Sequence, residues 1–263
     1  MARIDSLYRY PVKGLTPERL TRAVLTPGAT IAADRRYAIE NGPSGFDPAA
    51  PKHQPKTKYL MLMRQESLAR LDTHYDDATH ELVVRSDGAV AARGDLSTQA
   101  GRAAIEGFFA RYSAQDLNGP PKVLQADDFS FSDVPRKVVS IINLASVAQL
   151  ETVLGTAVHP LRFRGNVYVS GWPAWHEFEL IGREIALGEA RVKIVKRVVR
   201  CAAINVDPVT GIRDLNLPDS LMRNFGHPDC GVYGEVTEGA EIKDGDEVRP
   251  ASSWPDLFRP SAS

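Results

Sequence analysis

The sequence predicts a β-rich, mixed α+β protein in two halves, with a barrel in the second half. Many short apolar segments alternate with turn residues, and only a few segments show helical periodicity. In the second half, five short strand-like segments are interrupted by a single helix, which favours a barrel over an alternating parallel sheet. With 263 residues and 43% hydrophobic side chains, the chain can build one large domain or two modest ones.

The first half is expected to consist mainly of short strands. The predicted strands cover residues 4–10, 20–25, 35–40 and 59–63. Between the last two, residues 41–58 are rich in Pro, Gly and Lys and are expected to form a loop.

A hairpin and a helix are expected to follow. Asp87-Gly88 separates the strand-like segments 81–86 and 89–93, which is the strongest hairpin signal in the chain. Apolar residues then recur at helical spacing over 97–112. The next stretch, 118–135, is rich in Pro and Asp and interrupts the periodicity. We therefore expect an N-terminal domain over 1–120, a second domain over 121–250 and a tail over 251–263.

The second half is expected to begin with a strand that runs directly into a helix. Val138–Ile142 is a buried-type strand, and Asn143 is a plausible N-cap for a helix that ends near Leu154. A helix start directly after a strand leaves backbone N–H groups free for an anion. Further strands are expected at 166–170, 184–187, 191–200, 232–237 and 246–249, with one more helix near 217–225.

Composition excludes several classes of protein. The 32 basic and 33 acidic residues are nearly balanced, which argues against a nucleic-acid partner or a membrane-binding surface. The chain has neither an apolar run of about 20 residues nor a signal-peptide core, so we expect a cytoplasmic protein. Two cysteines are too few for a disulfide scaffold and cannot by themselves hold an iron–sulfur cluster.

Cys201 is the residue with the clearest chemical potential. It ends the strand 191–200, and Lys196, Arg197 and Arg200 precede it. Neighbouring cations favour the thiolate, which binds metals and attacks sulfur. The alternative is an ordinary core role, because free cysteine is among the most often buried residues.

The segment that begins at Cys201 also carries a family resemblance. Arg200-Cys201 followed by Val206-Asp207-Pro208-Val209-Thr210-Gly211 resembles the signature of MOSC domains. Three further motifs match in the expected order. They are Tyr10-Pro11-Val12-Lys13-Gly14 with Asp34-Arg35-Arg36 in an N-terminal MOSC-associated β-barrel domain, Phe163-Arg164-Gly165-Asn166, and Gly245-Asp246.

This resemblance spans roughly residues 1–250 and extends to the mitochondrial amidoxime-reducing component and its bacterial relatives. It implies a MOSC β-barrel plus an N-terminal β-barrel-like domain, with the molybdenum cofactor in a cleft between them. Cys201 would ligate molybdenum, and Asp207 is the weaker catalytic candidate because Asp-Pro also starts turns. The residues implied to hold the pterin and its phosphate are Lys13, Arg35, Arg36, Asn143, Ser146, Arg164, Asn166 and Arg200.

Several of these roles have plain structural alternatives. Arg35 and Arg36 would alternate faces on a strand, so only one is expected to point inward. Asn143 and Ser146 can equally be helix caps. Gly165 departs from the family's usual proline, which loosens the backbone beside Arg164.

Two further groups of residues were weighed as sites. Cys201, His227 and Cys230 could in principle bind zinc, although half of the usual ligand pattern is absent. Trp172 and Trp175 are candidates for the rim of a substrate opening, with packing as the alternative.

The resemblance implies an oxidoreductase that reduces N-hydroxylated small molecules, with electrons supplied by a ferredoxin- or cytochrome-type partner. Pyridoxal phosphate is not expected, because the chain carries no aminotransferase-like domain. Two other functions stay open: a sulfur carrier that holds a persulfide on Cys201, and a non-catalytic cofactor-binding or chaperone module.

Overall fold

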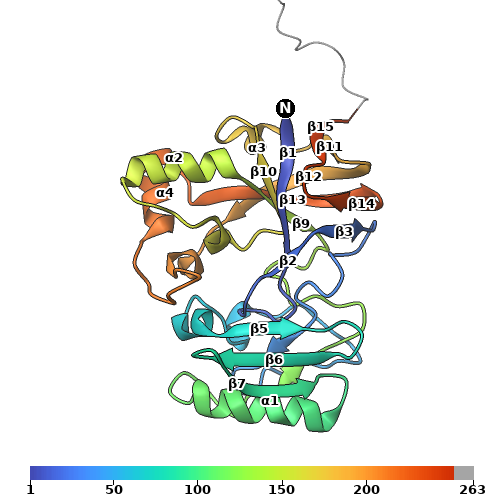
Figure 1. Ribbon diagram of the computed structural model, residues 1–263, viewed down its shortest axis with the longest axis vertical. Helices are drawn as coiled ribbons and strands as arrows, with labels where there is room; N and C mark the ends of the chain where they lie inside the picture. Colours follow the sequence, from blue (N-terminus) through green and yellow to red (C-terminus); the bar gives the residue numbers. More distant parts are fainter. Residues whose placement is uncertain (252–263) are drawn as a thin grey trace, which may run out of the picture.

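The computed structural model describes residues 1–251, so the predicted tail lies almost wholly outside the described residues. The chain forms a barrel flanked by helices and, beside it, a smaller body of one sheet and one helix (Figure 1). The two bodies have separate hydrophobic cores. The structure confirms the prediction of a β-rich protein that contains a barrel.

Seven strands close the barrel, and the first of them comes from the N-terminus of the chain. Around the barrel the order is β10-β9-β13-β12-β11-β15-β1, and β1 pairs again with β10. Neighbouring strands are antiparallel, except for the parallel pair β9 and β10. The strands are β1 (Ala2–Arg9), β9 (Val139–Asn143), β10 (Val167–Ser170), β11 (Glu184–Leu187), β12 (Ala190–Val199), β13 (Asp229–Glu238) and β15 (Glu247–Pro250).

Short edge strands extend this framework. Strand β2 (Glu18–Leu20) adds to β1 outside the closed ring, and β3 (Arg22–Leu25) pairs with β14 (Ala240–Lys243). Strands β1 and β3 at the N-terminus therefore pair with strands of the second half. The expected division of the chain near residue 120 stays a prediction.

Helices cover one side of the barrel. They are α2 (Leu144–Leu154), α3 (His176–Glu179) and α4 (Leu217–Phe225), with the 3₁₀ turns η3 (Pro160–Phe163) and η4 (Ala202–Asn205). Asn143 caps α2 as predicted, since its side chain accepts a hydrogen bond from the N–H of Ala145. A third hydrophobic cluster lies between these helices and the barrel.

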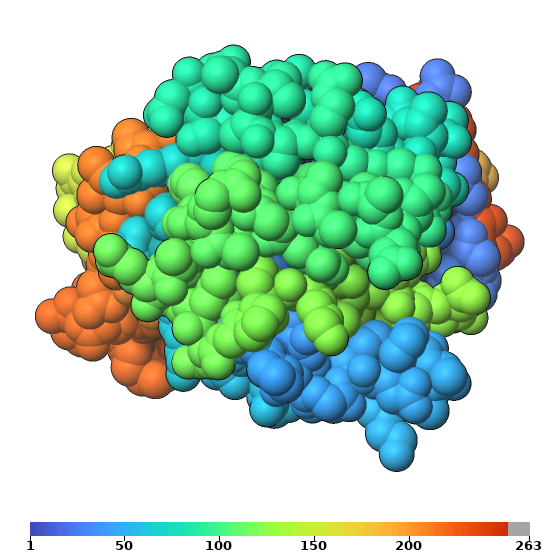
Figure 2. All heavy atoms as spheres, turned by 90° about the horizontal axis from the view of Figure 1, so that it is seen from below, coloured from blue at the N-terminus to red at the C-terminus, as the bar shows by residue number. Residues whose placement is uncertain are grey.

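The smaller body is an antiparallel sheet covered by one helix. It contains β5 (Asp72–Tyr75), β6 (Glu81–Ser86), β7 (Ala89–Asp95) and α1 (Gln99–Tyr112), which confirms the predicted hairpin and helix. Seen from below, α1 and the segments beside it cover this end of the molecule (Figure 2). The remaining short elements are β4 (Ala38–Ile39), β8 (Val123–Leu124), η1 (Lys56–Lys58) and η2 (Glu66–Arg70).

Three of the expected strands of the first half differ in the structure. The strand predicted over 35–40 is reduced to β4, because Arg35 adopts a left-handed conformation with φ 53°. The strand predicted over 59–63 is a single bridge at Tyr59 followed by a turn. The strand predicted over 20–25 breaks at Thr21 into β2 and β3.

Within residues 1–251, every helix is too short or too polar to cross a membrane.

Two glycines in α1 predict opposite effects of the same substitution. A Cβ on Gly101 would lie 2.0 Å from the carbonyl oxygen of Asp95, so Gly101→Ala forces α1 away from β7. A Cβ on Gly107 would meet nothing closer than 3.8 Å. We expect Gly101→Ala to lower the free energy of unfolding by about 1–3 kcal/mol, and Gly107→Ala to raise it by about 0.5–1 kcal/mol. Urea denaturation of both variants checks this, and a loss of stability in Gly107→Ala would contradict the packing described.

Candidate functional site

A cavity of about 420 Å³ lies where the barrel meets the loops of the smaller body. Its volume is within the range of small-molecule sites. Eight cationic side chains line it against two carboxylates, Asp34 and Asp133. The cations are Lys13, Arg35, Lys56, Arg162, Arg164, Lys196, Arg197 and Arg200. The cavity is therefore strongly suited to an anion, although the net charge of the whole chain is only −1.

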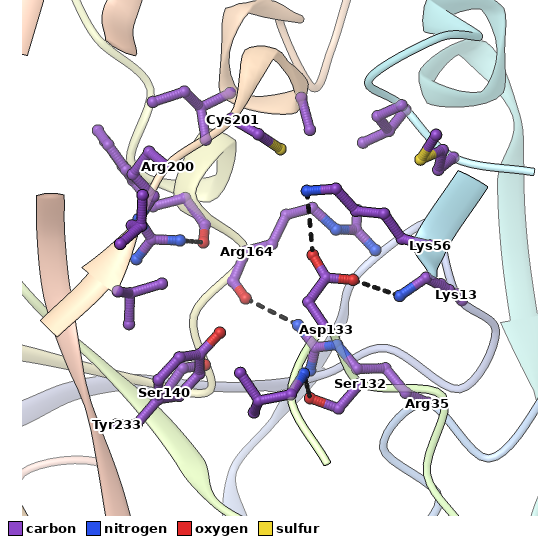
Figure 3. Close-up of a pocket in the computed structure, with 18 of the residues that line it drawn as sticks. Lys13, Arg35, Lys56, Ser132, Asp133, Ser140, Arg164, Arg200, Cys201 and Tyr233 are labelled. Atoms are coloured by element: carbon purple, nitrogen blue, oxygen red, sulfur yellow. Dashed lines mark hydrogen bonds and ion pairs between the residues drawn. The ribbon is translucent and has the colours of Figure 1, made fainter. Parts of the chain in front are cut away.

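Cys201 lines the cavity at the end of β12. The strand ends at Val199, and the N–H of Arg200 then bonds to the carbonyl of Pro228, which turns the chain into η4. Cys201 is partly buried, and its thiol faces the amine of Lys56 (Figure 3). Burial opposes the charge of Lys56, but Asp133 and then Cys201 raise its pKa. The thiol thus lies beside a cationic side chain in the wall of the cavity.

Arg200 fixes the backbone around the cysteine. Its guanidinium donates to the carbonyl of Phe163 at 2.7 Å and from Nε to the carbonyl of Cys230 at 2.8 Å. These bonds connect the end of β12 to β13 and to η3. Arg200 therefore holds Cys201 in place, while its charge still faces the cavity.

Arg35 and Arg164 flank Tyr10 at one side of the cavity. Their guanidinium carbons lie 4.6 and 4.3 Å from the centre of the Tyr10 ring. Arg35 pairs with Asp34 and donates to the carbonyl of Arg164 at 3.0 Å. Burial opposes the charge of Arg35, but Asp34 and Tyr10 raise its pKa, whereas burial lowers the pKa of Arg164. Arg36 does not line the cavity and lies over the Tyr37 ring, so Arg35 is the inward-facing residue of the pair.

Lys13 and Lys56 share one carboxylate, that of Asp133. Lys13 is 7% exposed, and its amine donates to the Phe131 carbonyl at 2.8 Å and pairs with Asp133. The other carboxylate oxygen is 3.8 Å from the amine of Lys56. Burial opposes ionisation of Asp133, but the lysines lower its pKa to about 2.

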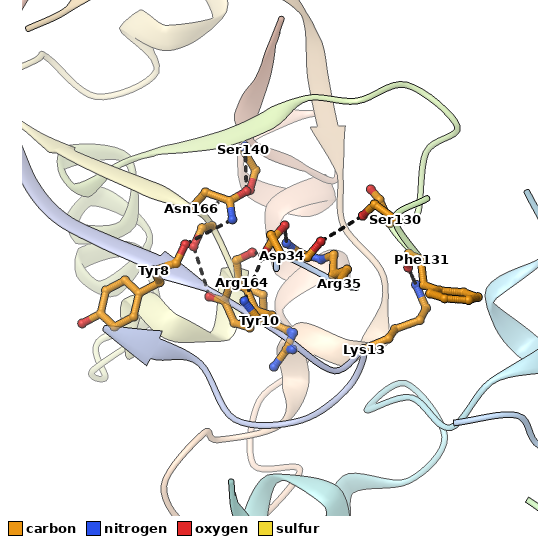
Figure 4. A network of polar contacts seen from close by, with 12 residues as sticks. Tyr8, Tyr10, Lys13, Asp34, Arg35, Ser130, Phe131, Ser140, Arg164 and Asn166 are labelled. Atoms are coloured by element: carbon orange, nitrogen blue, oxygen red, sulfur yellow. Dashed lines mark hydrogen bonds and ion pairs between the residues drawn. The ribbon is translucent and has the colours of Figure 1, made fainter. Parts of the chain in front are cut away.

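Asn166 ties together the strands behind the cavity (Figure 4). Its carbonyl oxygen accepts bonds from the N–H and the hydroxyl of Ser140, at 3.1 and 2.8 Å. Its amide donates to the carbonyl of Tyr8 at 3.2 Å. The side chain thus joins β9, β10 and β1. Asn166 lines the cavity, but its hydrogen bonds are used within the protein, and its role in cofactor binding stays a prediction.

Arg162 was missed by the sequence prediction. It is 3% exposed and bonds to the carbonyl of Asn205 and the carboxylates of Asp207 and Asp214, at 2.9, 3.0 and 2.8 Å. Its Nε has no hydrogen-bond partner among the described residues. A buried, unsatisfied donor in the wall of the cavity is expected to bond to a ligand.

Family models match almost the whole chain. The MOSC N-terminal beta barrel domain matches residues 1–118, and the MOSC domain matches residues 127–249. The chain is a MOSC domain protein. The order of the two domains is the one that the motifs predicted.

Curated relatives match this MOSC protein over shorter stretches. Mitochondrial amidoxime reducing component 2 of Bos taurus is 29% identical over 122 residues, which is 42% of this chain and 36% of the relative. Molybdenum cofactor sulfurase of Caenorhabditis elegans is 32% identical over 97 residues, 35% of this chain and 13% of the relative. The match thus spans about a third or less of these relatives' length.

Two solved structures resemble the MOSC protein weakly. The YuaD protein from Bacillus subtilis has a TM-score of 0.45 at 12% identity, covering 94% of this chain and 93% of that one. YiiM from Geobacillus stearothermophilus has a TM-score of 0.35 at 16% identity, covering 43% and 53%. These scores are too low to assign a function.

The structure places Asn143 and Ser146 outside the cavity, contrary to the prediction from the MOSC resemblance. Both are fully buried and donate to the carboxylate of Glu177, Asn143 at 2.8 Å and Ser146 at 2.9 Å. Burial raises the pKa of Glu177, and these donors oppose the shift. The two side chains satisfy a buried carboxylate beside α3 and have no free group for a phosphate.

Asp207 also lies outside the cavity, contrary to its predicted place beside the metal. One carboxylate oxygen accepts from the N–H groups of Val209 and Thr210, at 2.9 and 2.8 Å, and the other pairs with Arg162. Asp207 therefore shapes the turn after η4 and anchors Arg162. This is the structural alternative that the Asp-Pro sequence allowed.

The zinc alternative has no support in the described residues. Cys230 is fully buried, and burial raises the pKa of its thiol to about 12, so it stays protonated. His227 packs edge-on against Trp175 and Phe178. Within residues 1–251 no three His, Cys, Asp or Glu side chains are grouped so that they could hold a metal.

The two tryptophans pack against hydrophobic clusters and do not line the cavity. Trp172 contacts the barrel core, and Trp175 packs between the barrel and its helices. The packing alternative therefore describes both residues.

Lys56, Asp133 and Tyr233 line the cavity but were missed as site residues. Lys56 and Asp133 belong to segments that the sequence marks only as loops, where no periodicity indicates direction. Tyr233 lies on β13, and its sequence neighbours predict only a strand. The one available signal was that Lys56 ends a Lys-rich loop.

There is a physical reason for glycine at position 165, where the family usually has proline. A Cβ there would lie 2.3 Å from Cγ1 of Ile142, and the N–H of Gly165 donates to the Tyr168 hydroxyl at 3.0 Å. Proline would clash and would lose this hydrogen bond. Glycine thus allows a large residue on β9 and leaves Arg164 at φ 49°.

Gly165→Ala is expected to lower the free energy of unfolding by about 1–3 kcal/mol, because the new methyl group overpacks the site. Combined with Ile142→Ala, the loss should be smaller than the sum of the single losses, because the clash is relieved. A double-mutant cycle by urea denaturation measures this, and strict additivity would contradict the contact.

Asp207→Ala is expected to lower the free energy of unfolding by about 1–3 kcal/mol, because it leaves the turn N–H groups and the buried Arg162 less satisfied. Denaturant unfolding measures the loss. Exposed Asp219, which pairs with Arg223 on the surface of α4, supplies the control: Asp219→Ala should cost about 0.5 kcal/mol or less. Equal effects would refute the structural role of Asp207.

Proposed function

We propose that this MOSC protein binds the molybdenum cofactor in the cavity and acts as an oxidoreductase toward N-hydroxylated small molecules. The observation that carries the proposal is the position of Cys201, a soft thiol ligand in the wall of a cavity lined by eight cationic side chains. A thiolate suits a soft transition-metal site, and fixed cations suit a phosphate.

The residues present fit such a cofactor. A pterin phosphate needs charged donors, which the Lys13 and Lys56 amines and Arg35 provide. The flat pterin ring carries hydrogen-bonding edges, and Arg162 offers a buried Nε that lacks a partner among the described residues. Among residues 1–251, the Arg164 side chain donates one hydrogen bond, to the carbonyl of Leu15 at 2.9 Å, which leaves guanidinium donors for a ligand.

Each group has a distinct role in this proposal. Cys201 would hold the metal, and Arg200 would hold the backbone at Cys201 in position through its hydrogen bond to the Cys230 carbonyl. Lys13, Lys56 and Arg35 would bind the phosphate, while Tyr10 would orient Arg35 and Arg164 through their cation–π contacts. The cofactor, when bound, supplies the two-electron oxygen-transfer chemistry. The protein supplies position and charge.

The names of the relatives support the class of reaction. One relative is an amidoxime reducing component, which favours reduction of an N-hydroxylated substrate. We propose that a separate protein, of the ferredoxin or cytochrome type, supplies the electrons.

A sulfur carrier is the second candidate, and one contact favours it. With the Lys56 ammonium beside it, the Cys201 thiolate would attack the outer sulfur of a donor persulfide and take up that sulfur as the donor thiolate leaves. The match to molybdenum cofactor sulfurase adds support. In this function, Cys201 would carry sulfur to another protein, and purified protein would hold no molybdenum.

The proposal predicts about one molybdenum and one pterin per chain when the protein is made in a host that synthesises the cofactor. Cys201→Ala removes the thiolate and should lose most of the metal. Cys230→Ala is the matched control, because that thiol is buried and protonated. Elemental analysis and pterin fluorescence measure both contents.

Each outcome separates the candidates. Molybdenum in wild type, its loss in Cys201→Ala and reduction of an amidoxime by a chemically reduced sample would support the oxidoreductase. Molybdenum without turnover by any donor would favour a cofactor-binding module. Protein free of molybdenum, with a persulfide on Cys201 by mass spectrometry, would favour the sulfur carrier and contradict the proposal.

A further inference from the structure

We infer that Asp133 is an internal anion that occupies the lysine pair of the cavity until a phosphate-bearing ligand displaces it. The identity of that ligand rests on the proposed function, but the displacement itself can be tested with inorganic phosphate. Figure 3 shows the carboxylate between the two lysine amines.

The first support is the dependence of Lys13 on one short segment. Its amine bonds to the Phe131 carbonyl and pairs with the carboxylate of Asp133, two residues further on. Lys13 is buried, and a buried ammonium without a counter-charge is costly. Asp133 therefore supplies Lys13 with the counter-charge that a phosphate oxygen could also supply.

The second support is that Asp133 can leave while Lys13 cannot. Its side chain is 47% exposed, and residues 132–135 form no helix or strand. The segment is anchored just before it, where the N–H of Phe131 donates to the Arg35 carbonyl at 2.8 Å. After it, Arg136 pairs with Glu235 at the surface at 2.9 Å. Lys13, by contrast, lies in a turn whose backbone bonds to Tyr37.

The third support is the distribution of negative charge. Of the two carboxylates that line the cavity, Asp34 is committed to Arg35 and accepts from the N–H of Tyr10 at 2.9 Å. Asp133 faces the two lysines. A phosphate brings more charge and more acceptor oxygens than one carboxylate, so it can replace Asp133 on both amines. The displaced carboxylate then becomes hydrated by solvent.

The alternative role for Asp133 is to hold the lysines in position for the ligand. The two roles predict opposite effects of removing its charge. A competitor, when removed, makes phosphate bind more tightly, whereas a positioning residue, when removed, makes phosphate bind more weakly.

The test is calorimetric titration of cofactor-free protein with inorganic phosphate at constant ionic strength. We expect Asp133→Asn to bind phosphate about tenfold more tightly than wild type, because the apparent Kd is inversely proportional to the fraction of sites that are open. Asp133→Glu keeps the charge and should retain weak binding. Asp128→Asn is the matched control, since Asp128 precedes the anchor at Phe131, is 92% exposed and pairs with Lys137.

Two further measurements keep the inference testable if Asp133→Asn folds poorly. Without phosphate, the unfolding midpoint of Asp133→Asn should be lower than that of wild type. Added phosphate should raise the midpoint of Asp133→Asn by more than it raises the midpoint of wild type. In wild type, phosphate should speed tryptic cleavage after Arg136 or Lys137, because the segment is released. Unchanged or weaker phosphate binding in Asp133→Asn, or slower cleavage with phosphate, would overturn the inference.

The result is independent of metal binding. Failure of the molybdenum test would leave the phosphate result standing, and failure of the phosphate test would leave Cys201 as a metal ligand.

Discussion

The pairing of β1 with β10 is the constraint on which the site depends. This pairing closes the barrel. It also places Tyr10 and Lys13, which follow β1 in the chain, near the end of β12 at Cys201. The amide of Asn166 locks this closure by bonding to Tyr8 while its carbonyl oxygen holds Ser140. A fully satisfied buried network of this kind fixes a single arrangement of the strands. The N-terminal segment therefore builds both the barrel and the cation-rich wall.

The concentration of positive charge is possible because most guanidinium groups are bound within the protein. Arg200 bonds to backbone carbonyls, Arg162 to two carboxylates and Arg35 to Asp34. Groups fixed in this way need little reorganisation when an anion arrives. Lys13 and Lys56 differ, because their shared partner is one carboxylate on a short segment without regular structure. The fixed guanidinium groups and the displaceable Asp133 carboxylate thus belong to different segments.

The sequence could predict what depends on local pattern. Turn residues and periodicity gave the hairpin at Asp87-Gly88 and helix α1, and ordered motifs indicated Lys13, Arg35, Arg164 and Cys201, all of which line the cavity. Asn143, Ser146 and Asp207 were misplaced because capping and turn geometry look identical to ligand binding in a sequence. Asp133 and Lys56 were missed because loops carry no periodic signal, and only the closed barrel brings them together. The left-handed turn at Arg35 likewise depends on its bonds to Tyr10 and Phe131.

The central claim is that a molybdenum-bearing ligand lies in this cavity against Cys201. Anomalous diffraction at the molybdenum absorption edge, from crystals of protein loaded in a cofactor-producing host, tests it most directly. The account predicts one anomalous peak inside the cavity, at bonding distance from the sulfur of Cys201, with phosphate density beside Lys13. A molybdenum peak at any other place on the protein would contradict it.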